Sequence, residues 1–368
     1  MNATRQLHDL GQRIWLDNIT RGILNDGTLQ RYISELSVTG LTSNPTIFDH
    51  AIGKGDLYDD SIRRRAADGT SAEALFFELA IEDLTRAADL FRPVHDSTDG
   101  VDGWVSLEVS PLLANDTAST IRAAVELHAR AGRPNIFIKI PGTPEGVPAI
   151  EESIFRGVPI NVTLLFSAAQ YVAAAEACMR GIERRIAAHL DPRVASVASL
   201  FVSRWDVAVQ DTVPPPLRNR LGIAVARRTY REYRALLASP RWRALAAVGA
   251  RPQRLLWAST GTKDPTAPDT LYVEALAAPD TINTIPDKTL AAFADHGTVK
   301  GALPLDGGNA DAVLAEFARA GVDATALAGQ LQREGTESFD KSWAALLDRL
   351  VAKRTTLAQR DPTTASKP

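Results

Sequence analysis

The chain has 368 residues, of which 45% are hydrophobic, so it can bury a large core as one big domain or two ordinary ones. Its 41 basic and 44 acidic residues are mixed along the sequence and give a formal net charge of −3, which argues against a nucleic-acid or membrane partner. Residues 1–10 lack the apolar core of a signal peptide, and no later window resembles a membrane span, so we expect a soluble, cytoplasmic protein.

Short β-branched or aromatic runs alternate with amphipathic helical stretches along the whole chain, a pattern typical of a parallel sheet with crossover helices. We expect eight strands, centred on residues 14–16, 38–41, 104–108, 136–140, 159–165, 198–202, 255–258 and 281–284. Eight such strands favour a (β/α)8 TIM barrel, whose active site would lie at the carboxyl ends of the strands. A doubly wound open sheet is the structural alternative.

Additional helices account for the length beyond a minimal barrel. Residues 49–98 and 217–250 contain helical patterns that we interpret as long crossover connections. We see no internal repeat and no linker, so we expect one barrel domain over residues 1–354. Residues 355–368 lose apolar periodicity, which predicts a flexible C-terminal tail.

The strand predicted at 136–140 contains Lys139, the only lysine between Lys54 and Lys263. A lysine, unlike an arginine, can lose its proton in apolar surroundings and attack a carbonyl group, so Lys139 is a candidate Schiff-base nucleophile. Alternation along the strand places Phe137 and Lys139 inside the barrel, with the isoleucines facing the helices. From position alone, a lysine whose tip reaches solvent past the strand end is an equally good interpretation.

Polar side chains alternate in the same way on two neighbouring strands. Ser106 and Glu108 can both face inward, and so can Asn161 and Thr163. Each one alone is more often a hydrogen-bonded core residue than a catalyst, but four of them on adjacent strands favour a site. Glu108 is a candidate acid or base, and Thr163 is a candidate for holding a water between Glu108 and Lys139.

Further candidates follow other predicted strands. Asp17 and Asn44 come after the first two strands, although a helix cap and a turn residue, respectively, are the simpler interpretations. Arg204 and the Ser259 to Lys263 loop would reach the barrel mouth and are the best candidates for binding phosphate. Neither this loop nor the glycines near 142–146 match a nucleotide-binding pattern.

The sequence gives little support for a metal or another cofactor. The six histidines are scattered without ligand spacing, and a single cysteine, Cys178, excludes a thiolate cluster and an internal disulfide. The helical surroundings of Cys178 favour a core position. We therefore expect no metal and no cofactor.

Seven segments of the chain carry chemistry-bearing residues in a specific order; they are Ile14-Trp-Leu-Asp-Asn-Ile, Gly40-Leu-Thr-Ser-Asn-Pro-Thr-Ile-Phe, Ser106-Leu-Glu-Val, Ile136-Phe-Ile-Lys-Ile, Asn161-Val-Thr-Leu-Leu-Phe-Ser, Ser199-Leu-Phe-Val-Ser-Arg and Trp257-Ala-Ser-Thr. Together they resemble the transaldolase family, and the resemblance covers nearly the whole chain. The length and the first and last of these segments are similar to the longer bacterial branch. The resemblance implies a class I aldolase barrel of the pentose phosphate pathway. Such an enzyme transfers a dihydroxyacetone unit from sedoheptulose 7-phosphate to glyceraldehyde 3-phosphate, giving erythrose 4-phosphate and fructose 6-phosphate.

The resemblance also implies a role for each matching residue. Lys139 would form the Schiff base, Asp17 would exchange a proton at the bond that breaks, and Glu108 with Thr163 would manage the catalytic water. Asn44, Asn161 and Ser199 would hold the dihydroxyacetone portion. Arg204 and Ser259 would bind the phosphate. No metal is required, because the protonated imine stabilises the carbanion. The implied partners are sugar phosphates, and both a monomer and a homodimer are left open.

One departure from the family concerns phosphate binding. Better-known members carry an arginine shortly after the serine of the Ala-Ser loop, whereas this chain has Lys263 slightly later. We predict that Lys263 is the second phosphate cation.

The sequence leaves two alternative functions open. A fructose 6-phosphate aldolase would release free dihydroxyacetone, but those relatives are shorter and tend to have glutamine at Glu108 and tyrosine at Phe201. A catalytically silent binding barrel would have lost the lysine or both carboxylates.

Overall fold

Eight parallel strands close into a barrel in the order of the sequence, with β1 paired to both β2 and β8. The computed structural model describes residues 2–65 and 70–360. The strands are Arg13–Leu16 (β1), Val38–Thr42 (β2), Trp104–Glu108 (β3), Ile136–Pro141 (β4), Ile160–Leu165 (β5), Ser196–Phe201 (β6), Gln253–Ala258 (β7) and Ile282–Ile285 (β8). All eight predicted strands and the TIM barrel are confirmed, and the open sheet is wrong.

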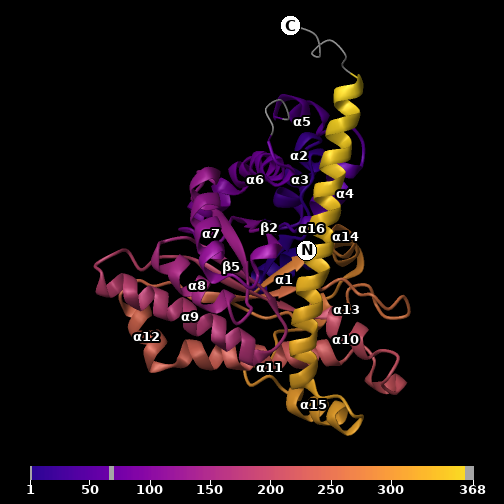
Figure 1. Ribbon diagram of the computed structural model, residues 1–368. Coiled ribbons are helices and arrows are strands. Elements are labelled where there is room, and N and C mark those ends of the chain that lie inside the picture. Colours follow the sequence, from indigo (N-terminus) through magenta and orange to yellow (C-terminus); the bar gives the residue numbers. More distant parts are fainter. Residues whose placement is uncertain (1, 66–69, 361–368) are drawn as a thin grey trace, which may run out of the picture.

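Helices connect the strands and cover the outside of the barrel (Figure 1). They are Ala3–Leu10 (α1), Arg21–Asn25 (α2), Thr28–Glu35 (α3), Pro45–Gly53 (α4), Asp59–Arg65 (α5), Ala72–Ser97 (α6), Thr117–Ala131 (α7), Gly146–Phe155 (α8), Ala168–Ala187 (α9), Ser203–Val209 (α10), Leu221–Ala238 (α11), Pro240–Ala247 (α12), Leu271–Ala275 (α13), Asp287–His296 (α14), Ala310–Arg319 (α15) and Ala324–Arg360 (α16). Helices α4 to α6 and α11 to α12 are the two long crossovers expected from the sequence. Within the described ranges, none of the helices is long and apolar enough to cross a membrane.

Strand β4 shows the predicted alternation. The ring of Phe137 stacks on that of Trp104, with centroids 4.1 Å apart, and lies 6.1 Å from that of Trp15, so these rings fill the barrel interior. The alternate residues pack instead in the cluster between the barrel and its helices; they are Ile136, Ile138 and Ile140. Lys139 shares the interior face with Phe137, as predicted. Cys178 is also buried in the outer cluster, which confirms its core position.

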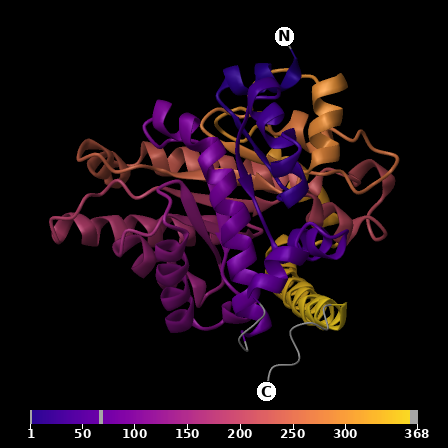
Figure 2. The ribbon, with the colours of Figure 1, turned by 90° about the horizontal axis from the view of Figure 1, so that it is seen from above.

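Helix α16 is the long yellow helix along one side of the molecule in Figure 1, and Figure 2 shows it at the edge when the molecule is seen from above. Buried residues recur along it every three or four positions; they are Ala328, Leu331, Gln332, Gly335, Phe339, Trp343, Leu346 and Leu350, followed by Leu357. This stripe packs the helix along α4 and α6 and against β5.

The C-terminal boundary differs from the prediction. Residues 355–360 were expected in a flexible tail, but they continue α16, and Leu357 is buried. Leu357 lies two helical turns beyond Leu350 and packs in the outer core cluster, a contact that composition alone does not reveal. Residues 361–368 of the predicted tail lie outside the described residues, and the single domain over 1–354 stays a prediction.

Candidate active site

A cavity of about 280 Å³ opens at the carboxyl ends of the strands. Most of the predicted site residues line it, namely Asp17, Asn44, Lys139, Thr163, Ser199, Phe201, Arg204, Ser259 and Lys263. The other three, Ser106, Glu108 and Asn161, are buried next to these residues rather than in the cavity wall. Because the strands are parallel, side chains that are far apart in the sequence meet at one end of the barrel.

Lys139 is buried at the cavity wall, and 7% of its side chain is exposed. Its Nζ donates to Oε2 of Glu108 at 3.0 Å and to the Ser43 carbonyl at 3.0 Å. The pairing of β3 with β4 sets Glu108 directly opposite Lys139 and accounts for this contact. The interpretation of a lysine tip reaching solvent is therefore wrong. A primary amine buried against a carboxyl group and facing a cavity can attack the carbonyl carbon of a bound ligand.

Glu108 is suited to donate and accept protons beside that amine. Burial raises the pKa of its carboxyl group, and the positive charge of Lys139 opposes the rise. Among the described residues, Oε1 of Glu108 and Oγ1 of Thr163 are both buried without a hydrogen-bond partner. Two such atoms beside a reactive amine suit a ligand hydroxyl or a water. Glu108 and Lys139 touch directly, and a water held by Thr163 beside them stays a prediction.

Asp17 lies across the cavity from this pair, directly after β1. Its backbone N–H donates to the Ile285 carbonyl at 2.9 Å, and its Oδ1 accepts from Thr42 Oγ1 at 2.9 Å. Burial raises the pKa of Asp17, and the charge of Lys139 works against the rise. A carboxyl group with a raised pKa can exchange a proton with a ligand hydroxyl near neutral pH.

A chain of hydrogen bonds inside the barrel joins three of the predicted polar residues, which lie on β3, β5 and β6. Asn161 Nδ2 donates to Ser106 Oγ at 3.0 Å, and Ser199 Oγ donates to Asn161 Oδ1 at 2.8 Å. Of the three, only Ser199 lines the cavity. Asn44 also lines it while its Oδ1 caps α4 by accepting from Ile47 N at 3.0 Å. Ser106 therefore supports Asn161 and Ser199 from inside the barrel, away from the cavity. Contact of Asn44 and Asn161 with a substrate stays a prediction.

The far end of the cavity carries two cations. Arg204 is the second residue of α10, which follows β6, and its guanidinium carbon lies 5.4 Å from the Phe201 ring centroid. Lys263 lies in the loop after β7. Within the described part of the chain, neither cation forms an ion pair with a carboxylate. Ser259 has a left-handed backbone, with φ of 56°, and its hydroxyl lies 2.9 Å from that of Ser203. Two unpaired cations beside two hydroxyl groups suit an anionic ligand such as a phosphate.

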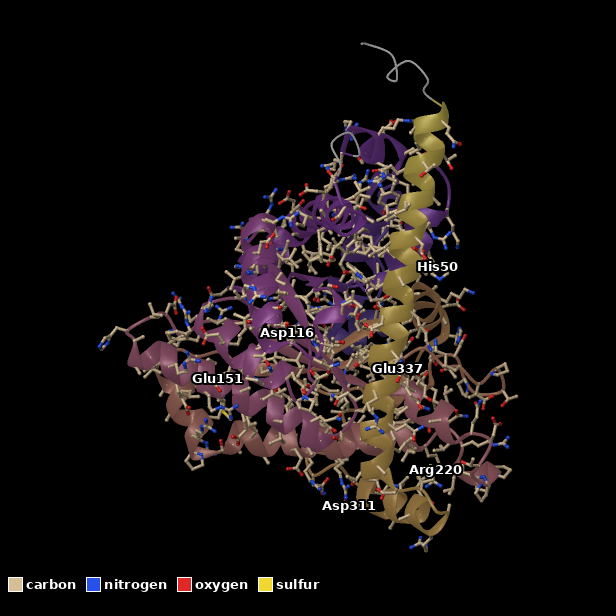
Figure 3. The ribbon with its side chains drawn as sticks, in the orientation of Figure 1. His50, Asp116, Glu151, Arg220, Asp311 and Glu337 are labelled. Atoms are coloured by element: carbon tan, nitrogen blue, oxygen red, sulfur yellow. The ribbon has the colours of Figure 1, made fainter. Side chains whose placement is uncertain are left out.

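Several cavity residues were not predicted from the sequence; they are Thr42, Thr46, Ile47, His50, Ala258, Gly261, Thr284, Pro286 and Phe339. Phe339 belongs to α16, and its ring centroid lies 5.8 Å from Lys139 Nζ. The helical spacing of Leu331, Gly335, Phe339 and Trp343 marks a buried face, but not which strand that face covers. Figure 3 labels His50, at the end of α4, and Glu337, on the outer side of α16. No cluster of three or more His, Cys, Asp or Glu side chains in the described ranges is arranged to hold a metal ion.

Comparison with known proteins agrees with this site. The model of the transaldolase/fructose-6-phosphate aldolase family matches residues 14–350. The chain is 46% identical over 355 residues to a transaldolase of Thiobacillus denitrificans, covering 94% of this chain and 99% of that protein. A transaldolase of Thermobifida fusca is 45% identical over 360 residues, with 94% and 97% covered, and one of Acidothermus cellulolyticus is 46% identical over 350 residues, with 93% and 94% covered. The chain belongs to the transaldolase/fructose-6-phosphate aldolase family.

Proposed function

We propose that this chain is an enzyme of the transaldolase type that transfers a dihydroxyacetone unit from sedoheptulose 7-phosphate to glyceraldehyde 3-phosphate through a Schiff base on Lys139. The observation that carries the proposal is the buried contact of Lys139 with Glu108 at the wall of the cavity. The family and the names of its relatives support the same reaction. Sugar phosphates are thus the expected ligands.

The first half of the reaction forms the imine. The neutral amine of Lys139 attacks the C2 carbonyl of the ketose, and the resulting carbinolamine loses its hydroxyl group as water. Glu108 donates the proton that this departing hydroxyl group needs, since burial raises the pKa of its carboxyl group. Thr163 would bind this water through its Oγ1, which is buried without a hydrogen-bond partner among the described residues. The product is a protonated imine, which attracts electrons from the neighbouring carbon–carbon bond.

The second half breaks one bond and forms another. Asp17 takes the proton from the C4 hydroxyl group and the C3–C4 bond breaks. The electron pair of that bond forms the C2=C3 double bond, and the π electrons of the imine move onto its nitrogen, which leaves an enamine. The aldose, erythrose 4-phosphate, departs. The enamine carbon then attacks the aldehyde carbon of glyceraldehyde 3-phosphate, and Asp17 returns its proton to the new hydroxyl group. Water adds to the imine and releases fructose 6-phosphate from Lys139.

For the phosphate group, we assign Arg204, Ser259 and Lys263. Lys263 would act as a point charge, because an ammonium group cannot make the two parallel bonds of a guanidinium. Charge reversal in Lys263→Glu should raise the KM for sugar phosphates more than it lowers kcat. Unchanged kinetic constants would contradict this assignment.

A transfer assay tests the reaction. The enzyme is incubated with fructose 6-phosphate as donor, with and without erythrose 4-phosphate as acceptor, and both sedoheptulose 7-phosphate and free dihydroxyacetone are measured. We expect transfer to exceed release. Predominant release would favour the fructose 6-phosphate aldolase alternative, and no turnover would favour a silent binding barrel. A cytoplasmic location and a homodimer stay proposals, which fractionation and light scattering would test.

A further inference from the structure

Gln332 of α16 is a buried polar residue that bridges the ends of two strands. Its Nε2 donates to the Gly142 carbonyl at 2.9 Å and to the Leu164 carbonyl at 2.9 Å. Gly142 directly follows β4, which carries Lys139, and Leu164 directly follows Thr163 in β5. A single amide group thus fixes two main-chain carbonyls, each within three residues of a side chain assigned to the chemistry.

The backbone at Leu164 needs such support. Leu164 has a φ of 58°, in the left-handed region that is unfavourable for a residue with a Cβ atom. The pairing of β5 with β6 shifts register between Val162 and Leu165, so Thr163 and Leu164 form a bulge. Bulges near active sites turn a side chain in a new direction. The Leu164 carbonyl accepts a side-chain hydrogen bond from Gln332 at this bulge.

Helix α16 packs directly on this bulge at Gly335, one turn beyond Gln332, where the helix has no side chain. A Cβ atom at Gly335 would lie 2.9 Å from Cδ2 of Leu164, closer than side chains tolerate, and 3.7 Å from Nη1 of Arg204. One turn further along, the ring of Phe339 faces Lys139. Successive turns of one helix face therefore contact the bulge and approach the arginine and the lysine of the cavity.

We propose that Gln332 is a positioning residue for the reaction: by holding the bulge at Leu164 against the end of β4, it aims the hydroxyl group of Thr163 at the Lys139–Glu108 pair. Gln332 does not line the cavity, so it acts through Thr163 and not on the substrate. This inference rests on the proposed function, since Thr163 matters only if the imine chemistry takes place.

The variant Q332M tests the inference, because methionine keeps the length of the side chain and removes both N–H donors. Its matched control is Q330M, two residues earlier on the same helix, where the side chain is exposed and bonds only Glu334 of its own helix. We expect kcat of Q332M to fall about ten- to hundredfold, the range expected when catalytic groups shift by about 1 Å, while KM changes by less than about threefold. Q330M should match the wild type.

A double-mutant cycle with Thr163→Val separates positioning from stability. If Gln332 acts by aiming the Thr163 hydroxyl group, Q332M should lower kcat by less than about threefold in an enzyme that lacks this hydroxyl group. Unchanged kcat in Q332M, or additive losses in the cycle, would overturn the inference. If Q332M does not fold, Q332E replaces it, and failure of both to fold would make Gln332 purely structural. A wild type that forms no adduct on Lys139 after borohydride reduction would refute the proposed function instead.

Discussion

Two buried ion pairs of similar geometry lie in different regions of this molecule. Arg21 and Asp83 join α2 to α6, with 2.9 Å between Nε and Oδ1 and side-chain exposures of 7% and 0%. Lys139 and Glu108 join β4 to β3, with 3.0 Å between Nζ and Oε2 and exposures of 7% and 5%. Distance and burial alone do not distinguish the two pairs.

Their surroundings differ. Asp83 accepts a second bond from the Tyr58 hydroxyl group at 2.8 Å, and Arg21 donates to Ser61 at 2.7 Å while its guanidinium lies 4.5 Å from the Tyr58 ring centroid. Protein groups therefore enclose this pair. The Lys139 pair instead reaches the cavity wall through Lys139. Each pair keeps one buried atom without a hydrogen-bond partner in the described structure, Oε1 of Glu108 and Nη2 of Arg21, so access to the cavity is what separates the pairs. The comparison indicates that an enclosed pair built on arginine stabilises the fold, whereas a lysine pair open to a cavity can act on a ligand.

Removing the lysine should have the largest effect, and on chemistry. In Lys139→Met the amine is gone, so we expect kcat/KM for transfer to fall by at least about a thousandfold. The fold should persist, because burial raises the pKa of the Glu108 carboxyl group, which can then stay protonated and neutral without its cation. Coupled transfer assays and circular dichroism measure the two outcomes. If Lys139→Met keeps its activity, the interpretation that the lysine pair at the cavity acts on the ligand is wrong.

Removing the arginine of the enclosed pair should affect stability instead. Arg21→Met leaves Asp83 buried without its cation, which costs about 3–5 kcal/mol of unfolding free energy, measured by urea denaturation. The kcat of the folded fraction should not change. The control is Arg63→Met, whose exposed pair with Asp60 should be worth less than about 1 kcal/mol. Equal stability losses in the two variants would show that enclosure contributes nothing.

Asp206, unlike Asp83 and Glu108, is a buried carboxyl group without a cation among the described residues. It accepts from the N–H groups of Leu221 and Gly222, at 2.8 and 3.2 Å, and from the Tyr272 hydroxyl group at 2.9 Å. Burial raises its pKa from 3.8 to about 6. A pKa raised by folding stabilises the folded state below pH 3.8, and this contribution is lost as the pH rises through about 6.

The variant Asp206→Asn measures that loss. The unfolding free energy of the wild type relative to Asp206→Asn should fall by about 3 kcal/mol between about pH 4 and pH 7, the equivalent of the pKa difference. Denaturation series at several pH values give this slope. A difference that is constant with pH, or that grows as the pH rises, would contradict the expectation.

Phe339 should give the smallest effect. Its ring shields Lys139 on the α16 side, and in Phe339→Ala we expect the ratio of released to transferred dihydroxyacetone to rise about two- to fivefold, as water reaches the imine and a weak cation–π contact is lost. Phe339→Leu keeps an apolar cover without a π face and so separates shielding from the ring contact. If the ratio does not change in either variant, α16 does not shield the imine on Lys139 from water.

The barrel could be predicted from the sequence because its signals are local. Period-two alternation in 136–140 put Lys139 inside and the isoleucines outside, and residues at strand ends converge in any parallel barrel. The position of α16 could not be predicted in this way. Gln332 and Phe339 meet the ends of β4 and β5 through contacts almost two hundred residues apart in the sequence, and helical periodicity identifies a buried face without identifying what it covers.

The same limit applies within the site. Glu108 and Lys139 were predicted as members of one site, but their direct contact depends on the register of β3 against β4, which no local pattern encodes. Thr42 and Thr284, whose hydroxyl oxygens lie 2.6 Å apart beside Asp17, were missed for a related reason. Each is an ordinary strand residue in the sequence, and only closure of the barrel brings the two strands to the same cavity.

Trapping the imine shows whether Lys139 is the nucleophile. The enzyme is reduced with borohydride in the presence of fructose 6-phosphate, digested and mapped by mass spectrometry. A dihydroxyacetone-derived adduct on the peptide that contains Lys139, absent from Lys139→Met and undiminished in the folded Arg21→Met protein, is the expected result. No adduct on that peptide, or an equal amount of adduct in Lys139→Met, would contradict the assignment of Lys139 as the nucleophile.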